Sequence, residues 1–220
     1  RDRRLKPMIF FKCLTAILAS LLVLLVSAQV SAENPKVRVQ TSLGAIELEL
    51  FAQDAPLTVA NFLRYIETNA FEATIFHRVI PGFMIQGGGY LPDFTELEEF
   101  ETIRNEADNG ISNSTGTIAM ARTNVIDSAG RQFFINVADN SRLDHQEDSC
   151  TRKQESDVMT ARQKGLFKPL NCASFGYAVF GTVISGMDIV NEIEIVETEQ
   201  RGSFDDVPMV PVVIESIKLL

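Results

Sequence analysis

The chain has no tryptophan and only two histidines, His77 and His145, among its 220 residues. A hydrolase with a Ser-His-Asp or Cys-His arrangement needs a histidine beside a nucleophile, and no motif marks such a nucleophile. The chain also lacks a Gly-x-Ser-x-Gly turn, a Gly-x-x-x-x-Gly-Lys phosphate loop and a His-Glu-x-x-His helix. We therefore expect no metal site and no cofactor, and a secreted hydrolase that uses His77 or His145 stays open as an alternative.

Basic residues are in the minority, with 20 lysines and arginines against 29 aspartates and glutamates and a formal net charge of −9. An acidic surface repels nucleic-acid phosphates, so we expect no nucleic-acid partner. Alternatively, the excess of acidic residues only keeps the protein soluble. Hydrophobic residues make up 45% of the chain, which is enough for one good core, and the length favours a single domain after processing.

The first 32 residues have the order of a secretory signal peptide. Five basic residues up to Lys12 precede the almost wholly apolar run Leu14–Val26, and a stretch of small residues ends at Ala32. The apolar run is shorter than the roughly 20 residues that a spanning helix needs. We therefore expect cleavage after about Ala32, a mature domain of residues 33–220 and no stable membrane anchor, with a retained anchor as the alternative. Cleavage removes five of the 20 basic residues and one of the 29 acidic ones, which changes the formal net charge to about −13.

Two of the three cysteines, Cys150 and Cys172, lie beyond that segment. An even number of cysteines in an exported protein favours a disulfide, which would close a loop of about 20 residues and contribute roughly 3 kcal/mol. Two free buried thiols are the alternative. Both cysteines lie in a polar stretch, residues 146–174, that we interpret as a surface excursion, like the acidic stretch 93–101.

Short apolar segments separated by Gly, Asn, Asp and Pro dominate the rest of the chain. Residues 37–40 and 45–50 alternate around a connection that ends in Gly44, which is typical of a β-hairpin. Many short strands with few helices favour a β-barrel or a sandwich. The other predicted strands are residues 74–78, 83–86, 117–121, 133–137, 177–184 and 212–219.

Two helices are predicted among these strands. Asp54 precedes a run of apolar residues with helical spacing that ends at about Thr68, which predicts an amphipathic helix capped by Asp54. A shorter helix is expected around residues 187–193.

The run from Phe71 to Gly88 places one permanent cation, Arg78, among large apolar residues and an amide. Such a set suits a neutral, apolar ligand that carries a carbonyl group. The neighbouring His77 lies in a predicted strand, where alternation places it opposite both Phe76 and Arg78, so we interpret His77 as a packed structural residue. An ordinary core with the arginine stem packed on aromatic rings is the alternative to a binding site.

Several motifs follow one another along the chain. They are Phe76-His77-Arg78-Val79-Ile80, Phe83-Met84, Gln86-Gly87-Gly88, Gly116-Thr117-Ile118-Ala119-Met120-Ala121-Arg122, Gln132-Phe133-Phe134-Ile135 and Tyr177-Ala178-Val179-Phe180-Gly181. This series resembles the signature of the cyclophilin family of peptidyl-prolyl cis-trans isomerases. The similarity extends from about Lys36 to Leu220 and is interrupted mainly by residues 146–174.

The resemblance implies a mainly β fold, an eight-stranded antiparallel β-barrel closed by two α-helices. It also implies an enzyme that catalyses rotation of peptide bonds preceding proline in unfolded or flexible polypeptides. The sequence between Ala121 and Asn140 is similar to that of the exported bacterial members of the family. This similarity implies a periplasmic location and a role in the folding of exported proteins. A binding module or chaperone that uses the same groove without turnover is the main alternative.

Carried over position by position, the resemblance implies that Arg78 is the catalytic residue. Two further sets would bind the substrate, one enclosing the proline ring and the other holding the neighbouring peptide. The first set is Phe83, Met84, Phe134 and Leu143, and the second is Gln86, Gln132 and the backbone of Ala121 and Arg122, with Tyr177 where many relatives have histidine.

Two departures from the family pattern lie close together. Arg142 precedes Leu143 where many eukaryotic cyclophilins carry tryptophan, so we expect weak binding of cyclosporin. The stretch 146–174 follows directly, where bacterial relatives have a short connection. It either adds substrate selectivity or a partner surface, or it is a tolerated surface insertion.

Overall fold

The computed structural model describes residues 33–147, 150–165 and 173–220. The predicted signal peptide, residues 1–32, and Cys172 lie outside the described residues. Among the described residues, no helix has the length and apolar character needed to span a bilayer. Residues 34–220 form one structural unit, and all contacts given below lie within it.

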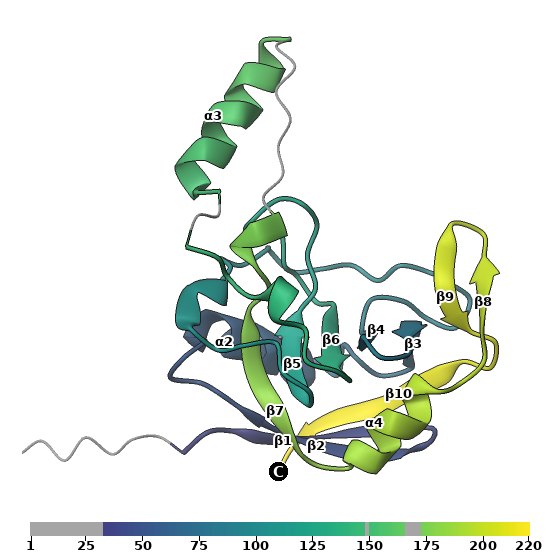
Figure 1. Ribbon diagram of the computed structural model, residues 1–220. Helices are drawn as coiled ribbons and strands as arrows, with labels where there is room; N and C mark the ends of the chain where they lie inside the picture. Colours follow the sequence, from purple (N-terminus) through teal and green to yellow (C-terminus); the bar gives the residue numbers. More distant parts are fainter. Residues whose placement is uncertain (1–32, 148–149, 166–172) are drawn as a thin grey trace, which may run out of the picture. The chain divides into compact units, whose positions relative to one another are not determined.

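Eight antiparallel strands close into a barrel (Figure 1). They are β1 (Lys36–Thr41), β2 (Gly44–Leu50), β3 (Thr74–Ile80), β4 (Met84–Gly87), β5 (Thr117–Met120), β6 (Phe133–Asn136), β7 (Val179–Ser185) and β10 (Val212–Leu219). Their order around the barrel is β1-β10-β3-β4-β6-β5-β7-β2. The hairpin expected at Gly44 is present, and it pairs Thr41 with Gly44 at its turn.

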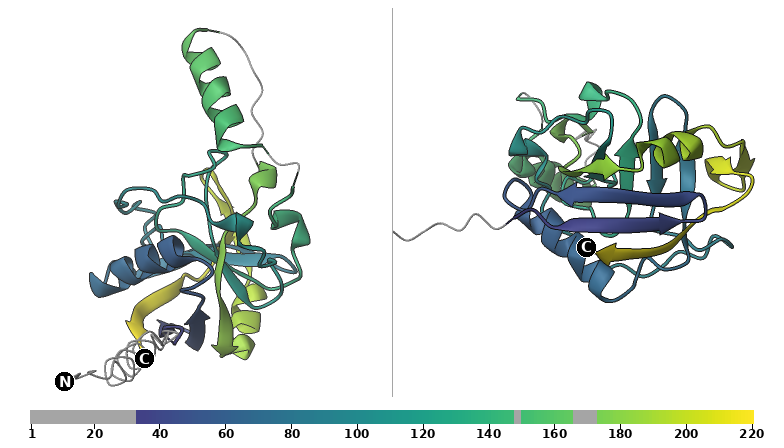
Figure 2. Two further views of the ribbon diagram at one scale, coloured as in Figure 1. Left: turned by 90° about the vertical axis from the view of Figure 1, so that its left-hand side faces the viewer. Right: turned by 90° about the horizontal axis from the view of Figure 1, so that it is seen from below.

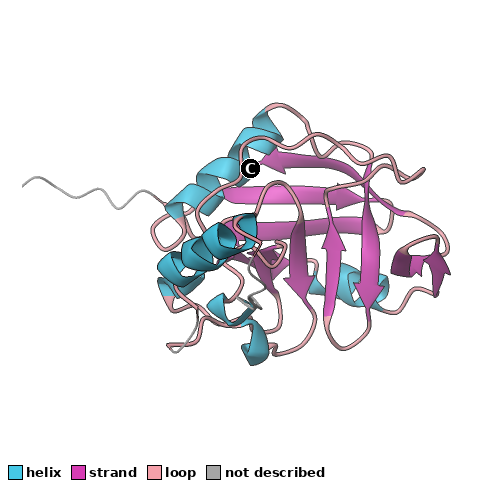
Figure 3. Ribbon diagram, turned by 90° about the horizontal axis from the view of Figure 1, so that it is seen from above, coloured by secondary structure: helices cyan, strands magenta, loops and turns pink. Residues whose placement is uncertain are grey.

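Alternation along the strands separates an inner from an outer set of side chains. In β6, Phe133 and Ile135 are fully buried in the large core inside the barrel, whereas Phe134 between them belongs to a separate apolar cluster on the outer face. The view from above shows the strands gathered together with helices at their margin (Figure 3). The barrel thus has one apolar interior and, on one outer face, a second apolar surface.

Two helices close the barrel, as expected. They are α2 (Pro56–Glu67) and α4 (Met187–Glu194), which lie on different sides of the strands (Figures 1 and 2). Phe62 of α2 and Val190 of α4 are buried in the same interior cluster. Burying an aromatic or branched side chain of this kind stabilises the fold by about 1.5–3 kcal/mol.

The start of α2 corrects the prediction that Asp54 caps it. The N-cap residue is Ala55, whose side chain makes no capping hydrogen bond. Instead, the carboxylate of Glu106 caps the helix from a loop distant in sequence, and it accepts hydrogen bonds from the backbone N–H groups of Leu57 at 3.1 Å and Thr58 at 2.8 Å. An acidic group at a helix N-terminus accepts hydrogen bonds from N–H groups that have no partner within the helix, and it interacts favourably with the helix dipole. Both effects are independent of the group's position in the sequence.

Further elements were not expected from the sequence. A hairpin outside the barrel, β8 (Thr198–Arg201) with β9 (Phe204–Pro208), packs the Phe204 ring 5.1 Å from the Tyr90 ring. The stretch 146–174 contains the helix α3 (Arg152–Gln163), which is mostly polar and lacks the apolar periodicity that predicts a helix. The short 3-10 helices are η2 (Ala107–Asn109), η3 (Ser141–Leu143) and η4 (Ala173–Phe175).

Candidate active site

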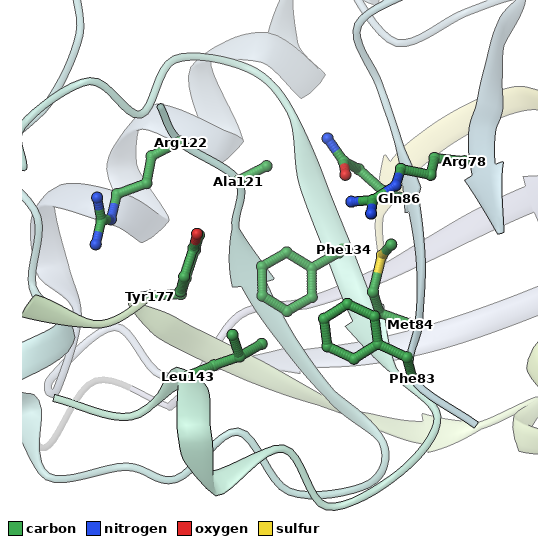
Figure 4. Close-up of a pocket in the computed structure, with 9 residues that line it drawn as sticks. All are labelled: Arg78, Phe83, Met84, Gln86, Ala121, Arg122, Phe134, Leu143 and Tyr177. Atoms are coloured by element: carbon green, nitrogen blue, oxygen red, sulfur yellow. The ribbon is translucent and has the colours of Figure 1, made fainter. Parts of the chain in front are cut away.

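A pocket on the outer face of the barrel brings together nine of the ten side chains expected to bind or act on a substrate (Figure 4). Arg78 and Gln86 lie on one side of the pocket, Arg122 and Tyr177 on the other, and Phe134 between them (Figure 4). The tenth residue, Gln132, lines an adjoining pocket. The nine lining residues are Arg78, Phe83, Met84, Gln86, Ala121, Arg122, Phe134, Leu143 and Tyr177.

Strand pairing determines which groups meet on this face. Arg78 of β3 pairs with Gln86 of β4, and Gln86 pairs with Phe134 of β6. Phe134 in turn pairs with Ala119 of β5. Directly paired residues place their side chains on the same face of a sheet, so the cation, the amide and the aromatic ring form one row across three strands.

The alternation predicted along β3 is wrong at one point. The pairing of β3 with β4 shifts by one residue between Phe76 and Arg78, which marks a β-bulge. Phe76 is therefore in the barrel core, while Arg78 lies on the outer face with Gln86. The bulge directs the arginine toward the pocket, and strict alternation would have placed it on the same side as Phe76.

The floor of the pocket is apolar and largely closed to solvent. Met84 and Phe134 are only 2% and 4% exposed, and they pack in one cluster with the partly buried Phe83, Leu143 and Tyr177. The rings of Phe134 and Tyr177 meet edge to face, with their centroids 5.8 Å apart. Such a floor suits a small apolar ring and gives a bound amide little access to water.

The polar groups at the rim are held by bonds within the protein. Gln86 donates from Nε2 to Oε1 of Gln132 at 2.9 Å, which links the two adjoining pockets. Arg122 donates from Nε to the carbonyl oxygen of Gly176 at 2.9 Å, and its guanidinium lies 4.7 Å from the Tyr177 ring. Burial lowers the pKa of Arg122 from its usual value. Arg122 therefore serves as part of the wall, and its charge is directed toward the backbone.

The family model of the cyclophilin type peptidyl-prolyl cis-trans isomerases matches residues 36–219. The chain belongs to the cyclophilin family. This confirms the resemblance, the fold class and the class of enzyme expected from the motifs.

Two bacterial relatives and one solved structure illustrate the similarity. Peptidyl-prolyl cis-trans isomerase A of Dickeya dadantii is 45% identical over 180 residues, which cover 82% of this cyclophilin and 82% of that protein. Peptidyl-prolyl cis-trans isomerase B of Escherichia coli is 42% identical over 177 residues, or 80% of this chain and 94% of the relative. A cyclophilin type isomerase of Cryptosporidium parvum, solved in the presence of the dipeptide Ala-Pro, aligns over 84% of this chain and 98% of its own with a TM-score of 0.60. At 22% identity it supports the fold alone.

His77 of this cyclophilin is packed away from the pocket. It is 4% exposed, its ring lies 4.7 Å from the Tyr90 ring, and its Nδ1 has no hydrogen-bond partner in the structure. Burial, with a smaller effect from the adjacent Arg78 charge, lowers its pKa from 6.5 to about 4. The neutral ring is a structural group. None of the nine residues that line the pocket is a serine, threonine or cysteine, so the pocket offers no nucleophile for a hydrolase of the Ser-His or Cys-His type.

An acidic partner of Arg78 was not expected from the sequence. Asp206 of β9 places its Oδ2 3.8 Å from Nε of Arg78, and both side chains are about two-fifths exposed, at 41% and 43%. Asp206 also has a positive φ of 59°, a conformation that aspartate and asparagine tolerate better than most residues. The β8–β9 hairpin thus carries a carboxylate to the Arg78 side of the pocket from more than a hundred residues away in the chain.

A buried amide network under the pocket was also not expected. Asn140 donates from Nδ2 to the backbone oxygen of Phe83 at 2.7 Å and to Oδ1 of Asn136 at 2.8 Å. Asn136 donates to the hydroxyl of Thr117 at 2.9 Å. These bonds fix the backbone that presents Phe83 and Leu143, because Leu143 follows Asn140 through the short helix η3 and its N–H bonds the Asn140 carbonyl.

Two further expectations concern cysteine and metal. Cys150 is disulfide-bonded. Because Cys172 lies outside the described residues, its pairing with Cys150 stays a prediction. In the described part of the chain, no three His, Cys, Asp or Glu side chains gather where a metal ion could bind.

Proposed function

We propose that this cyclophilin accelerates rotation about peptide bonds preceding proline in exported proteins that are unfolded or partly folded, and so assists their folding. Arg78 is the proposed catalytic residue. The observation that supports this most is the position of Arg78 at the rim of a pocket whose floor, Met84 and Phe134, is apolar and almost fully buried. A cation beside an oily cavity for one small ring matches the chemistry of an imide bond next to proline.

The reaction makes and breaks no covalent bond. Rotation about a peptide bond interrupts amide resonance at a barrier of about 18–20 kcal/mol, and bonds before proline exchange unaided in tens to hundreds of seconds. In the twisted state the nitrogen lone pair is no longer shared with the carbonyl group. A donor that interacts with this nitrogen more strongly in the twisted state than in the planar one lowers the barrier.

Arginine suits this role better than lysine. Its guanidinium stays charged, and several N–H donors in a rigid fork can approach the twisted nitrogen while one edge faces Asp206. Since each 1.36 kcal/mol of differential stabilisation raises the rate tenfold, a single well-placed donor has a large effect.

The remaining pocket residues would hold the substrate. Phe83, Met84, Phe134 and Leu143 would enclose the proline ring, and the loss of water from the amide would disfavour its more polar planar form. The linked amides of Gln86 and Gln132, with the backbone at Ala121 and Arg122, lie along the route from the first pocket into the second. They would hold peptide groups next to the proline.

Export to the periplasm rests on the order of charges and apolar residues before Ala32. It is tested separately from the chemistry. Full-length chain is expressed in a Gram-negative host, and the mass of the mature protein in the periplasmic extract is measured. A product beginning at about Glu33 is expected, and an uncleaved chain in the membrane fraction would refute the signal peptide.

The activity is tested by NMR exchange spectroscopy on a short proline peptide. Wild-type protein is expected to speed cis-trans exchange at substoichiometric concentration, and Arg78→Ala is expected to lose on the order of 100-fold or more of kcat/KM. Circular dichroism of the variant controls for folding. Exchange no faster than in buffer would refute the isomerase, and peptide binding without faster exchange would instead support the binding module.

A further inference from the structure

Helix α3 extends away from the barrel (Figure 1), and its first turn is attached to loops beside the barrel. Arg152 donates from Nε to Oδ2 of Asp127 and from Nη2 to Oδ1, both at 2.9 Å. The same Nη2 also reaches the carbonyl oxygen of Asn105 at 2.8 Å. The guanidinium lies 4.7 Å from the centroid of the Phe175 ring. A two-pronged pair of this kind fixes orientation as well as distance.

Glu155, one turn later, makes a second attachment to the same loop. Its Oε1 accepts the backbone N–H of Ile126 at 2.8 Å. The Ile126 side chain is fully buried in a small cluster that includes Phe175 and Ala178, and Cys150 packs against that cluster just before α3 begins. Two successive residues of the loop, Ile126 and Asp127, are thus held by one face of the helix.

Two other charged residues of α3 pair with each other. Lys153 and Asp157 form an ion pair at 2.8 Å, and their side chains are 84% and 59% exposed. Lys153 and Asp157 provide a matched pair of opposite charges on the same helix for comparison.

The loop that α3 holds, residues 121–130, forms a wall of the second pocket. Thr123, Ser128 and Gly130 line this pocket, and it shares Gln86, Ala121 and Arg122 with the first. Within the loop, Thr123 N–H donates to the Ser128 hydroxyl at 3.0 Å, and that hydroxyl donates to the Val125 carbonyl at 2.7 Å. These bonds close the loop on itself, and Oδ1 of Asp127 also accepts the backbone N–H of Asn105 at 2.9 Å. Helix α3 therefore adds two side-chain attachments to a loop that already contacts the body of the protein.

We infer that the first turn of α3 is a positioning element of an extended substrate groove. Arg152 and Glu155 hold the 121–130 loop in the shape that the second pocket requires, so the insertion sets the affinity for peptides that extend beyond the proline. This inference rests on the proposed function, because it assumes that the proline ring occupies the first pocket. Arg152 and Glu155 line neither pocket, so they act by positioning the loop and not by touching the substrate.

The test compares two peptides and two double variants. One peptide is short and fills only the first pocket, while the other has the same central proline bond with several flanking residues on each side. Arg152→Ala/Glu155→Ala removes both attachments, and Lys153→Ala/Asp157→Ala removes one charge of each sign from the same helix while leaving Arg152 and Glu155 in place. KM and kcat are measured for both peptides with the purified protein.

The expected result is a split between the peptides. In Arg152→Ala/Glu155→Ala, KM for the extended peptide rises about three- to ten-fold, the loss typical of one or two charge-assisted hydrogen bonds. Its kcat, and both constants for the short peptide, stay within about twofold of wild type because the first pocket is intact. The Lys153→Ala/Asp157→Ala control matches wild type on both peptides.

Equal losses on both peptides, or no change on either, would overturn the inference. If the double variant does not fold, Glu155→Ala alone still removes the acceptor of the Ile126 N–H group while leaving the Arg152–Asp127 pair, and a smaller rise in the same KM is expected. A wild-type protein inactive on the short peptide would instead refute the proposed function, so the two failures are distinguishable.

Discussion

Lowering the pH from 7 to 5 should destabilise this cyclophilin chiefly through His77. The folded protein keeps this ring neutral, because burial and the adjacent Arg78 lower its pKa from 6.5 to about 4. The unfolded chain binds a proton as the pH falls below about 6.5, and the folded chain does not until about 4. The contribution of His77 to the stability is therefore complete above pH 6.5, decreases as the pH falls from 6.5 to 4, and changes no further below pH 4.

The size of the effect follows from these two pKa values. At pH 5 the free energy of unfolding should be lower than at pH 7 by about 2 kcal/mol. The hydrogen-bonded carboxylates add little in this interval, because aspartates such as Asp127 and Asp139, whose pKa values are lowered by hydrogen bonds, titrate at more acidic pH. For Asp127, burial opposes that lowering, and the bonds from Arg152 and the Asn105 N–H outweigh it.

Urea denaturation followed by far-ultraviolet circular dichroism measures this loss, since the chain has no tryptophan to report on unfolding. Wild type, His77→Gln and His145→Gln are compared at pH 7 and pH 5. We expect His77→Gln to lose much less stability over this interval than wild type, and the His145→Gln variant shows whether the other histidine contributes. If His77→Gln loses as much as wild type, the buried neutral state of His77 is not the cause.

Three other outcomes can be checked directly. Asp206→Asn keeps the size of the side chain and its tolerance of positive φ but removes the charge beside Arg78, so kcat should fall about two- to fivefold in low salt and less in high salt. An unchanged kcat at low salt would dismiss Asp206 as a partner. Gly176 has φ at +88°, and a Cβ added there would lie 2.6 Å from the backbone nitrogen of His145, whereas Gly202 has φ at +62° and open space around it. Gly176→Ala should therefore lower the midpoint of thermal unfolding more than Gly202→Ala. Similar shifts for both would show that crowding is unimportant. Calorimetric titration with cyclosporin should show weak binding, because Arg142 stands over Phe83 at 4.4 Å in place of an indole donor, and nanomolar affinity would contradict this.

The hairpin of β1 and β2 could be predicted from the sequence because period-two alternation is a local property, and the structure pairs these two strands. The other short apolar segments fitted a barrel or a sandwich, and the resemblance to a family implied the eight-stranded barrel that the structure shows. The pocket residues could be named because the motifs around Arg78 and Phe134 resemble those of a family. Neither kind of signal reports a contact between distant parts of the chain.

The features that could not be predicted depend on contacts that form only in the folded chain, or on local irregularities that simple periodicity does not show. Glu106 caps α2 and Asp206 approaches Arg78 across long stretches of sequence, and only the folded chain brings them together. The bulge between Phe76 and Arg78 is invisible to a rule that counts alternate residues. Helix α3 has no apolar stripe, because its contacts with the barrel are made by the charged residues Arg152 and Glu155.

The central claim is that Arg78 acts on the twisted state of the peptide bond rather than on substrate binding. Its most direct test measures, for one proline peptide, both the dissociation constant and the enzyme-bound exchange rate by NMR line-shape analysis, in wild type and in Arg78→Lys. The lysine keeps the charge but loses the rigid fork, so the bound exchange rate should fall by at least about tenfold while the dissociation constant changes by less than about threefold. A dissociation constant that rises with an unchanged bound exchange rate would contradict the claim.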